Sequence, residues 1–338
     1  MDVLALKMSM VEYIFLSREI PLPLSVLKII QKNYDIFDVI NYSEKKMDSF
    51  LLSLKKNHNV NIRNIQKLVS NFGEKNNPHT FDMIKKKLEL CDNSDIKYYS
   101  YFDSKFPHSL KKIKPDIKLV FIKGDLKPED EKAVAIIGTR NPTEYGKKMA
   151  YLIAKRFTEL DFTIISGLAK GIDTIALKSA IDNGGRAIGV IASGILNMYP
   201  KENTSLAERI IENGAIISER FPYDNVNKRA LQIRNRITSG FGLGNIVVEG
   251  NEFSGTRWQL KFGKNQNKPA IGVEPLDDNC EQAFVPNYII REEGGARISN
   301  IEDVDYIAEM LLNEANFSQA KVKSRTKVMK QTNLFKYK

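Results

Sequence analysis

The chain has 338 residues, a net charge of +10 and a hydrophobic fraction of 42%, which is ordinary for a globular protein of about two domains. Its two cysteines, Cys91 and Cys280, form no CxxC pair, which argues against a zinc site or a disulfide framework and favours a reducing cytoplasm. The charge favours polyanionic partners, and the charged residues near the N-terminus argue against a signal peptide or a membrane span there.

Residues 1–95 are predicted to form a small helical domain. Apolar residues recur at helical spacing, for example at Val11, Ile14 and Phe15. We identify no catalytic or binding chemistry in this part of the sequence. Residues 96–132 are expected to form a connector that packs on the core domain that follows.

Residues 133–312 are predicted to form an α/β domain of extended Rossmann-like type. Short apolar segments alternate there with helix-length segments, which is typical of βαβ units in a mostly parallel sheet with helices on both faces. The expected strands are Ala133–Ile137, Phe162–Ile165, Ala187–Ala192, Ala215–Ile217, Asn245–Val248 and Ala270–Val273.

Small and polar residues follow five of these strands directly. Because the carboxyl ends of parallel strands converge on one edge of a sheet, we predict an anion site at that edge. The alternative is that the hydroxyl groups only cap the following helices. The segments are Gly138-Thr139-Arg140, Ser166–Gly171, Ser193-Gly194, Ser218-Glu219-Arg220, and Glu249-Gly250 with Ser254-Gly255-Thr256.

A basic run interrupts the α/β pattern between residues 225 and 248. It contains no acidic residue and includes Arg234-Asn235-Arg236. Guanidinium groups grip phosphates through paired donors, so the run favours a nucleotide or nucleic-acid backbone as ligand, with a solvated charged face as the alternative.

Familiar nucleotide motifs and catalytic groups are scarce. Neither G-x-G-x-x-G nor G-x-x-x-x-G-K-[ST] occurs, and all three histidines precede the α/β domain. Asp173, Glu219 and Glu249 could act as acids or bases, but we favour a role in orienting nearby cations. We predict no metal site and no cofactor.

Several motifs occur together in an order that resembles the DprA/Smf family of DNA-processing, recombination-mediator proteins. The resemblance covers residues 95–275. Its motifs are Phe106-Pro107 with Lys123-Gly124-Asp125-Leu126, Val134–Arg140, Ser166–Thr174, Tyr199–Asn203, Ser218-Glu219, Arg234–Ile237, and Val247–Glu249 with Ser254-Gly255.

The resemblance implies a non-enzymatic protein that binds single-stranded DNA, forms a homodimer and loads a RecA-type recombinase, notably during natural transformation. Bases would stack on Phe221, Tyr223 or Trp258. The expected DNA and phosphate ligands are Gly138, Thr139, Arg140, Ser166, Gly167, Lys170, Gly171, Arg234, Asn235, Arg236, Ser254, Gly255 and Thr256, supported by Asp173, Asn203, Glu219 and Glu249.

The chain departs from the family pattern at Leu177, where a histidine is usual, and at Arg257-Trp258, where small residues are common. Two alternatives therefore stay open. One is a nucleotide N-glycosidic hydrolase of the lysine-decarboxylase-like (LOG) group, although the P-G-G-x-G-T-x-x-E run of that group is absent. The other is a nucleotide-sensing domain.

Residues 313–338 are expected to form a basic, disordered tail. The tail ends in a segment that resembles peptides bound by replication sliding clamps, with Gln331, Leu334, Phe335 and Tyr337 at the matching positions. A clamp is therefore a possible partner, and chance similarity is the alternative.

Overall fold

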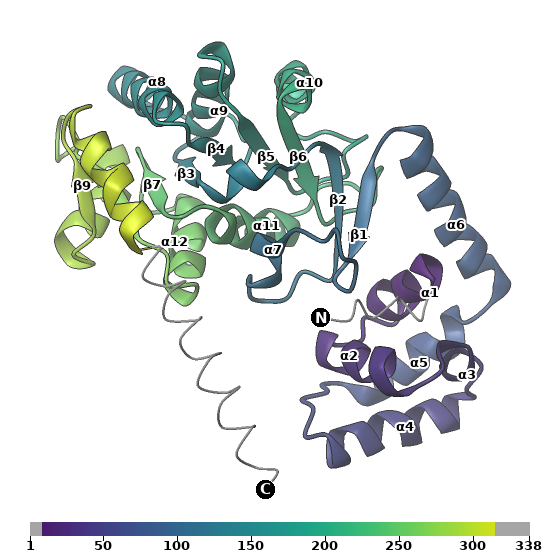
Figure 1. Ribbon diagram of the computed structural model, residues 1–338. Coiled ribbons are helices and arrows are strands. Elements are labelled where there is room, and N and C mark those ends of the chain that lie inside the picture. The colour runs from purple at the N-terminus through teal and green to yellow at the C-terminus, as the bar shows by residue number, and fades with distance from the viewer. Residues whose placement is uncertain (1–8, 315–338) are drawn as a thin grey trace, which may run out of the picture.

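A nine-stranded sheet runs through the computed structural model, which describes residues 9–314 (Figure 1). The strand order is β1-β2-β6-β5-β4-β3-β7-β8-β9, and all neighbours from β6 to β9 are parallel. The strands are β1 (Lys97–Ser100), β2 (Leu119–Gly124), β3 (Ala133–Ile137), β4 (Thr163–Ser166), β5 (Ala187–Ile191), β6 (Gly214–Ser218), β7 (Asn245–Val247), β8 (Ala270–Val273) and β9 (Ala296–Ile298).

Helices cover both faces of this sheet, as predicted for a doubly wound α/β protein (Figure 1). One face carries α8 (Glu144–Glu159), α9 (Ile172–Asp182) and α10 (Thr204–Glu212), and the other carries α7 (His108–Lys111), α11 (Lys228–Phe241) and α12 (Thr256–Asn265). The short elements are η2 (Pro128–Glu131), η3 (Lys201–Asn203), η4 (Glu281–Ala283), α13 (Phe284–Asn287) and η5 (Tyr288–Glu292).

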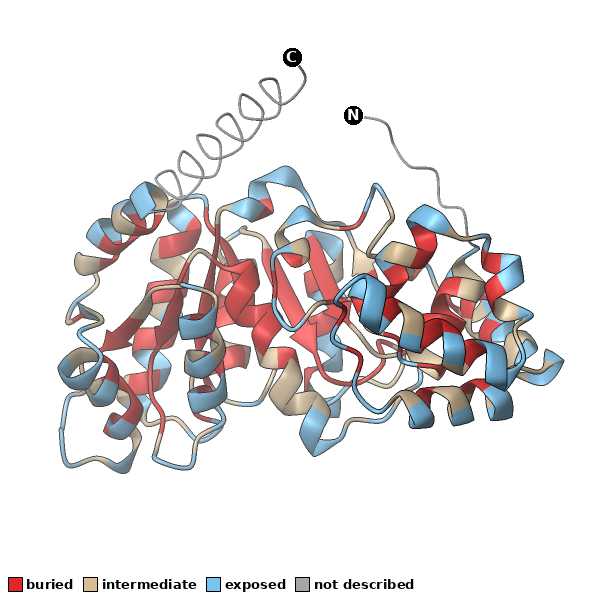
Figure 2. Cartoon of the chain, turned by 90° about the horizontal axis from the view of Figure 1, so that it is seen from below, coloured by how far each residue is buried: buried red, intermediate tan, exposed pale blue. Residues whose placement is uncertain are grey.

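Local sequence explains where the central helices begin. The Thr143 side chain accepts a hydrogen bond from the Gly146 amide and caps α8, and the Asn227 side chain caps α11 in the same way through the Ala230 amide. The strands between the helices are buried on both faces (Figure 2), which explains why they read as continuous apolar runs rather than alternating ones.

The N-terminal helices form a separate layer beside the β1 edge of the sheet (Figure 1). Tyr13 donates a hydrogen bond from its hydroxyl to the Lys118 carbonyl at 2.6 Å, and the Lys118 ammonium donates to the Ser17 and Leu22 carbonyls. The elements are α1 (Met10–Ile14), the π-helical turn η1 (Phe15–Glu19), α2 (Leu24–Asn33), α3 (Ile36–Ile40), α4 (Glu44–Asn57), α5 (Ile65–Lys75) and α6 (Pro78–Asn93).

The segment 96–132 belongs to the sheet more closely than the sequence suggested. It supplies β1 and β2, and β2 pairs antiparallel with β6. Strand pairing of this kind depends on contacts distant in sequence, which local periodicity does not reveal. Among residues 9–314, no helix is long and apolar enough to span a membrane.

One buried ion pair ties this segment to the parallel strands. Arg186, just before β5, donates to both carboxylate oxygens of Asp130 at 2.9 and 2.8 Å, and Thr163 in β4 donates to the same carboxylate at 2.8 Å. Asp130 is 1% exposed, so its charge depends on these partners.

We expect Arg186→Met to lower the free energy of unfolding by ~3–5 kcal/mol, because it leaves the Asp130 carboxylate buried without its cation. Urea unfolding would measure the loss. Arg209→Met is the control, since it removes an arginine from an exposed ion pair with Asp182, for which we expect less than ~1 kcal/mol. Equal effects of the two substitutions would contradict this role for Arg186.

Candidate functional site

A cavity of about 380 Å³ opens at the carboxyl ends of β3 and β7. The chain leaves β3 toward β4 and returns to β7 only after α11, so the direction of winding reverses between these two neighbours. Ligands of doubly wound proteins bind at such reversal points. The walls come from the loop after β3, the loop between β7 and α12, and the middle of α11.

Eight of the thirteen predicted DNA or phosphate ligands line this cavity, together with the supporting residue Asp173. They come from three segments, of which the first and last are more than a hundred residues apart in the chain, and the sheet topology brings them together. The eight are Gly138, Thr139, Arg140, Arg234, Asn235, Ser254, Gly255 and Thr256.

Arg234 lies in the cavity wall with only 8% of the residue exposed. Its Nη1 donates to the Val190 carbonyl at 3.0 Å, and its Nε has no hydrogen-bond partner among the described residues. Burial lowers the pKa of Arg234, while the nearby Asp173 carboxylate opposes that shift. The guanidinium is therefore a cation short of compensating charge, and an anion entering the cavity would stabilise it.

Asp173 shows the complementary effect. Burial raises its pKa, and Arg234 and the Ala169 amide oppose the shift. Burial thus disfavours the charged form of both groups, while each partly stabilises the other. This carboxylate and guanidinium form a polar floor for the site.

The rim of the cavity supplies further donors. Arg140 is exposed and lies beside Arg234 closely enough to repel it. Helix α12 begins with Gly255 at its N-cap, next to Ser254, so the positive end of its dipole lies at the cavity wall. The cavity wall thus combines two guanidinium groups with a helix N-terminus, the groups that favour an anion.

Arg236 requires a correction, because the structure places it away from the cavity. Its guanidinium makes a bidentate ion pair with Glu219 at 2.6 and 2.7 Å, and it also donates to the Pro115 and Ile233 carbonyls. Residues two apart on a helix point about 200° from each other. Since Arg234 faces the cavity, Arg236 faces the interior on the other side of α11.

Four other predicted ligands shape the loop after β4 rather than line the cavity. Ser166 is fully buried and donates to the Ile136 carbonyl at 2.6 Å, and Gly167 packs directly against the Arg234 guanidinium. Gly171 has φ +80°, and a Cβ there would lie 2.4 Å from the Thr139 carbonyl oxygen. Lys170 is exposed and pairs with Glu202 at 2.6 Å.

The supporting residues hold loops in place. Asn203 donates to the Leu168 carbonyl at 2.9 Å and to the Thr174 hydroxyl at 2.8 Å, which fixes the loop after β4. The Glu249 carboxylate accepts from the amide and hydroxyl of Thr143. It therefore anchors the start of α8, and no arginine within residues 9–314 pairs with it.

The three predicted stacking aromatics have different surroundings. Phe221 is 9% exposed and packs on Phe121, so it is not available to a base. Tyr223 is 61% exposed, and Trp258 is 40% exposed and lines the cavity. Sequence reasoning missed Phe253, which is 88% exposed and also lines the cavity. The sequence signal that could have identified Phe253 is its position in the loop that follows a predicted strand.

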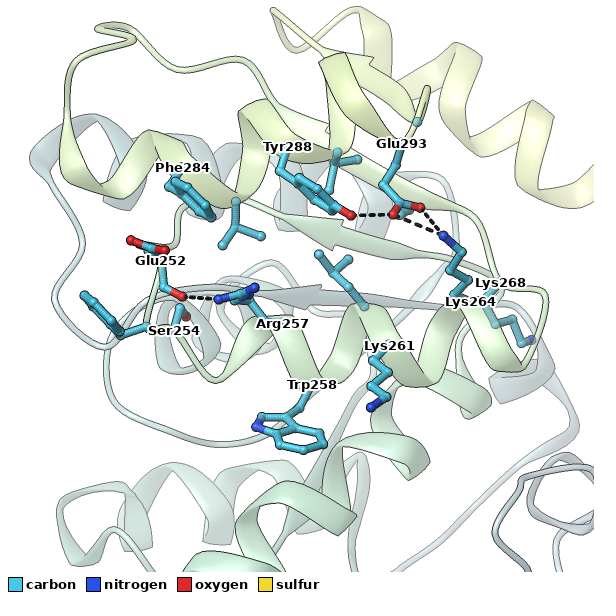
Figure 3. Close-up of a pocket in the computed structure, with 16 residues that line it drawn as sticks. Glu252, Ser254, Arg257, Trp258, Lys261, Lys264, Lys268, Phe284, Tyr288 and Glu293 are labelled. Carbon is cyan, nitrogen blue, oxygen red and sulfur yellow. Dashed lines mark hydrogen bonds and ion pairs between the residues drawn. The ribbon is translucent and has the colours of Figure 1, made fainter.

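A second, larger cavity of about 790 Å³ adjoins the first and shares Phe253, Ser254 and Trp258 with it (Figure 3). Lys264 and Tyr288 both contact the Glu293 carboxylate there. The unusual pair Arg257-Trp258 lies in its wall. Leu177, the other departure from the family pattern, is fully buried in α9 and lines neither cavity.

The fold and this site define a Rossmann-like protein with an arginine-lined cavity at the winding reversal of its sheet. The chain belongs to the family described as DNA recombination-mediator protein A, whose family model matches residues 97–310. This agrees with the resemblance seen in the sequence motifs.

Curated relatives support the assignment. The chain is 40% identical over 152 residues to the DNA processing protein DprA of Bacillus subtilis, covering 45% of this chain and 51% of the relative. It is 30% identical over 211 residues to DprA of Streptococcus pneumoniae, covering 61% of this chain and 72% of the relative. The chain thus spans about half the length of the first of these proteins.

Two solved structures are also similar. The X-ray structure of DprA from Streptococcus pneumoniae has a TM-score of 0.58 at 25% identity and covers 81% of this chain and 96% of its own. A structure of DprA from Helicobacter pylori has a TM-score of 0.57 at 26% identity and covers 64% and 97%. The latter structure is described as revealing a single-stranded DNA binding mode of that protein.

We expect Gly167→Ala to destabilise the protein by ~1–3 kcal/mol through overpacking, since the new Cβ would lie 1.6 Å from Arg234 Nη1 and force the buried guanidinium to move. Thermal or urea unfolding would measure this. Gly255→Ala is a matched control at the same cavity, because its Cβ meets nothing within 4 Å. Equal stability of the two variants would contradict the packing of Arg234 against Gly167.

Proposed function

We propose that this protein binds single-stranded DNA at the cavity between β3 and β7. The observation that carries the proposal is the Arg234 guanidinium, largely buried in the wall of a cavity that Arg140 and the N-terminus of α12 also line. A phosphate group supplies the negative charge that this arrangement lacks.

Aromatic side chains favour a nucleic-acid strand over an isolated inorganic anion. Phe253 and Trp258 line the cavity with large exposed fractions, and Tyr223 is exposed on the loop that leads into α11. Stacking of bases on such rings is sequence-tolerant, and basic groups beside them hold the backbone. The single-stranded DNA binding described for the Helicobacter pylori relative supports the same ligand class here.

By its family, the protein would mediate recombination by loading a RecA-type recombinase, without chemistry of its own. We propose that it acts in the cytoplasm as a homodimer, with natural transformation as one setting. We also propose that the chain divides into a helical domain (residues 1–95), a connector (96–132), a core domain (133–312) and a tail (313–338).

The comparisons do not favour the nucleotide-cleaving alternative. The clamp peptide lies outside the described residues and stays a prediction.

We expect Arg140→Ala to weaken binding to labelled oligonucleotides of every sequence alike and to reduce the slope of log K against log salt by ~1, because it removes one phosphate contact. Fluorescence anisotropy over a salt series would measure both quantities. Arg209→Ala is the control on α10, where the arginine pairs with Asp182. Binding of the Arg140 variant at full strength would argue against this cavity as the DNA site.

We expect Glu202→Gln to tighten oligonucleotide binding several-fold at low salt. The Glu202 carboxylate holds the exposed Lys170 ammonium at 2.6 Å, and its neutralisation frees that cation for a phosphate while removing a repulsive charge. The gain should disappear at high salt and in the double variant with Lys170→Met. Unchanged affinity at low salt would place Lys170 outside the DNA path.

A further inference from the structure

The loop between β6 and α11, residues 219–227, is held by the N-terminal helices. Arg18 on η1 donates from Nη2 to the Glu219 carbonyl at 2.6 Å and to the Leu119 carbonyl at 3.4 Å. The Lys87 ammonium on α6 lies 4.4 Å from the centre of the Phe221 ring. Two helices of the N-terminal layer therefore contact neighbouring residues of one loop in the sheet domain.

The same loop holds α11 through the side chain of Glu219. Its carboxylate forms the bidentate pair with Arg236, whose side chain is 4% exposed against 18% for Glu219. The Glu219 residue is thus restrained twice, at its carbonyl by Arg18 and at its carboxylate by α11. Bidentate geometry of this kind fixes orientation as well as distance.

Helix α11 carries the cavity residue Arg234 on the face opposite Arg236, with the cavity residue Asn235 about 100° from each. Because one turn of an α-helix is rigid, holding Arg236 in place also fixes the backbone position from which Arg234 reaches the cavity. A continuous series of contacts therefore runs from Arg18 through Glu219 and Arg236 to the Arg234 guanidinium.

We propose that Arg18 is a positioning residue for DNA binding, which acts from the N-terminal layer through Glu219 and Arg236 to place Arg234. The inference rests on the proposed function. It assigns the N-terminal helices a part in the affinity of a site that they do not line. Without Arg18, the Glu219 and Leu119 carbonyls lose a donor. Glu219 then keeps only the restraint at its carboxylate, so it holds Arg236 and α11 less firmly.

The test is Arg18→Met, which keeps most of the apolar stem and removes the donor. We expect labelled oligo-dT to bind roughly 5–30-fold more weakly, as loss of one or two restraints of ordinary strength would produce. The slope of log K against log salt should stay unchanged, because no phosphate contact is removed. A residue that touches the strand would lower the slope, as expected for Arg140. Arg18→Lys should recover part of the affinity.

Lys75→Met is the matched control. It breaks an ion pair of 2.9 Å with Glu19, the residue next to Arg18, and both partners lie within the N-terminal helices. We expect oligo-dT to bind this variant as tightly as the unsubstituted protein. A loss equal to that of Arg18→Met would mean that any loosening of these helices lowers affinity, which would overturn the specific role of Arg18.

Lys87→Met keeps the proposal testable if Arg18→Met does not fold, because it removes the second contact to the loop and should weaken binding by a smaller factor. If Arg18→Met folds and binds oligo-dT with full affinity, the inference is overturned. If Arg18→Met does not fold, full affinity of Lys87→Met overturns it. A lowered salt slope in Arg18→Met would do the same. If Arg140→Ala also binds at full strength, the proposed DNA site itself is wrong; if Arg140→Ala alone is weakened, only the role of Arg18 falls.

Discussion

The bidentate ion pair between Glu219 and Arg236 is the contact on which the arrangement of the site depends. Helix α11 crosses the sheet from the β6 side to β7, and this crossing creates the winding reversal at which the cavity opens. A helix in that position needs a fixed rotation about its axis, since a turn of about 100° moves the cavity face by one residue. The pair provides it, with both side chains largely removed from water and the Pro115 carbonyl as a further acceptor.

With α11 fixed, the electrostatics of the cavity follow from burial. Arg234 and Asp173 both lie where the charged form is costly, so burial lowers the pKa of the guanidinium and raises the pKa of the carboxyl group. A site that holds a cation in this state is prepared for an anion, because the cost of desolvating the guanidinium is already met by the fold. Lys170 differs from Arg234 in this respect, because its ammonium remains exposed to water and has the Glu202 carboxylate beside it.

Much of the fold was predictable from local pattern, and most of the misses have one cause. The strands Ala133–Ile137 and Ala270–Val273 were predicted with their observed bounds, because buried parallel strands leave continuous apolar runs between turn residues. The pairing of β2 with β6 was missed, since it depends on contacts distant in sequence. Phe221 was misjudged as a stacking residue because the helix that covers it, α6, lies more than a hundred residues away in the chain.

The sequence by itself determined the class of fold, the family motifs and the edge of the sheet where the cavity opens, because each is encoded in short segments whose residue types suffice. Tertiary structure alone decided which of two arginines in Arg234-Asn235-Arg236 faces the ligand, because that choice depends on the rotation of α11 and on the place of Glu219. It also decided that Arg18, a residue in a segment without recognisable chemistry, contacts the loop that leads to the site. Side-chain direction and long-range contact are properties of the packed chain, and no local pattern carries them.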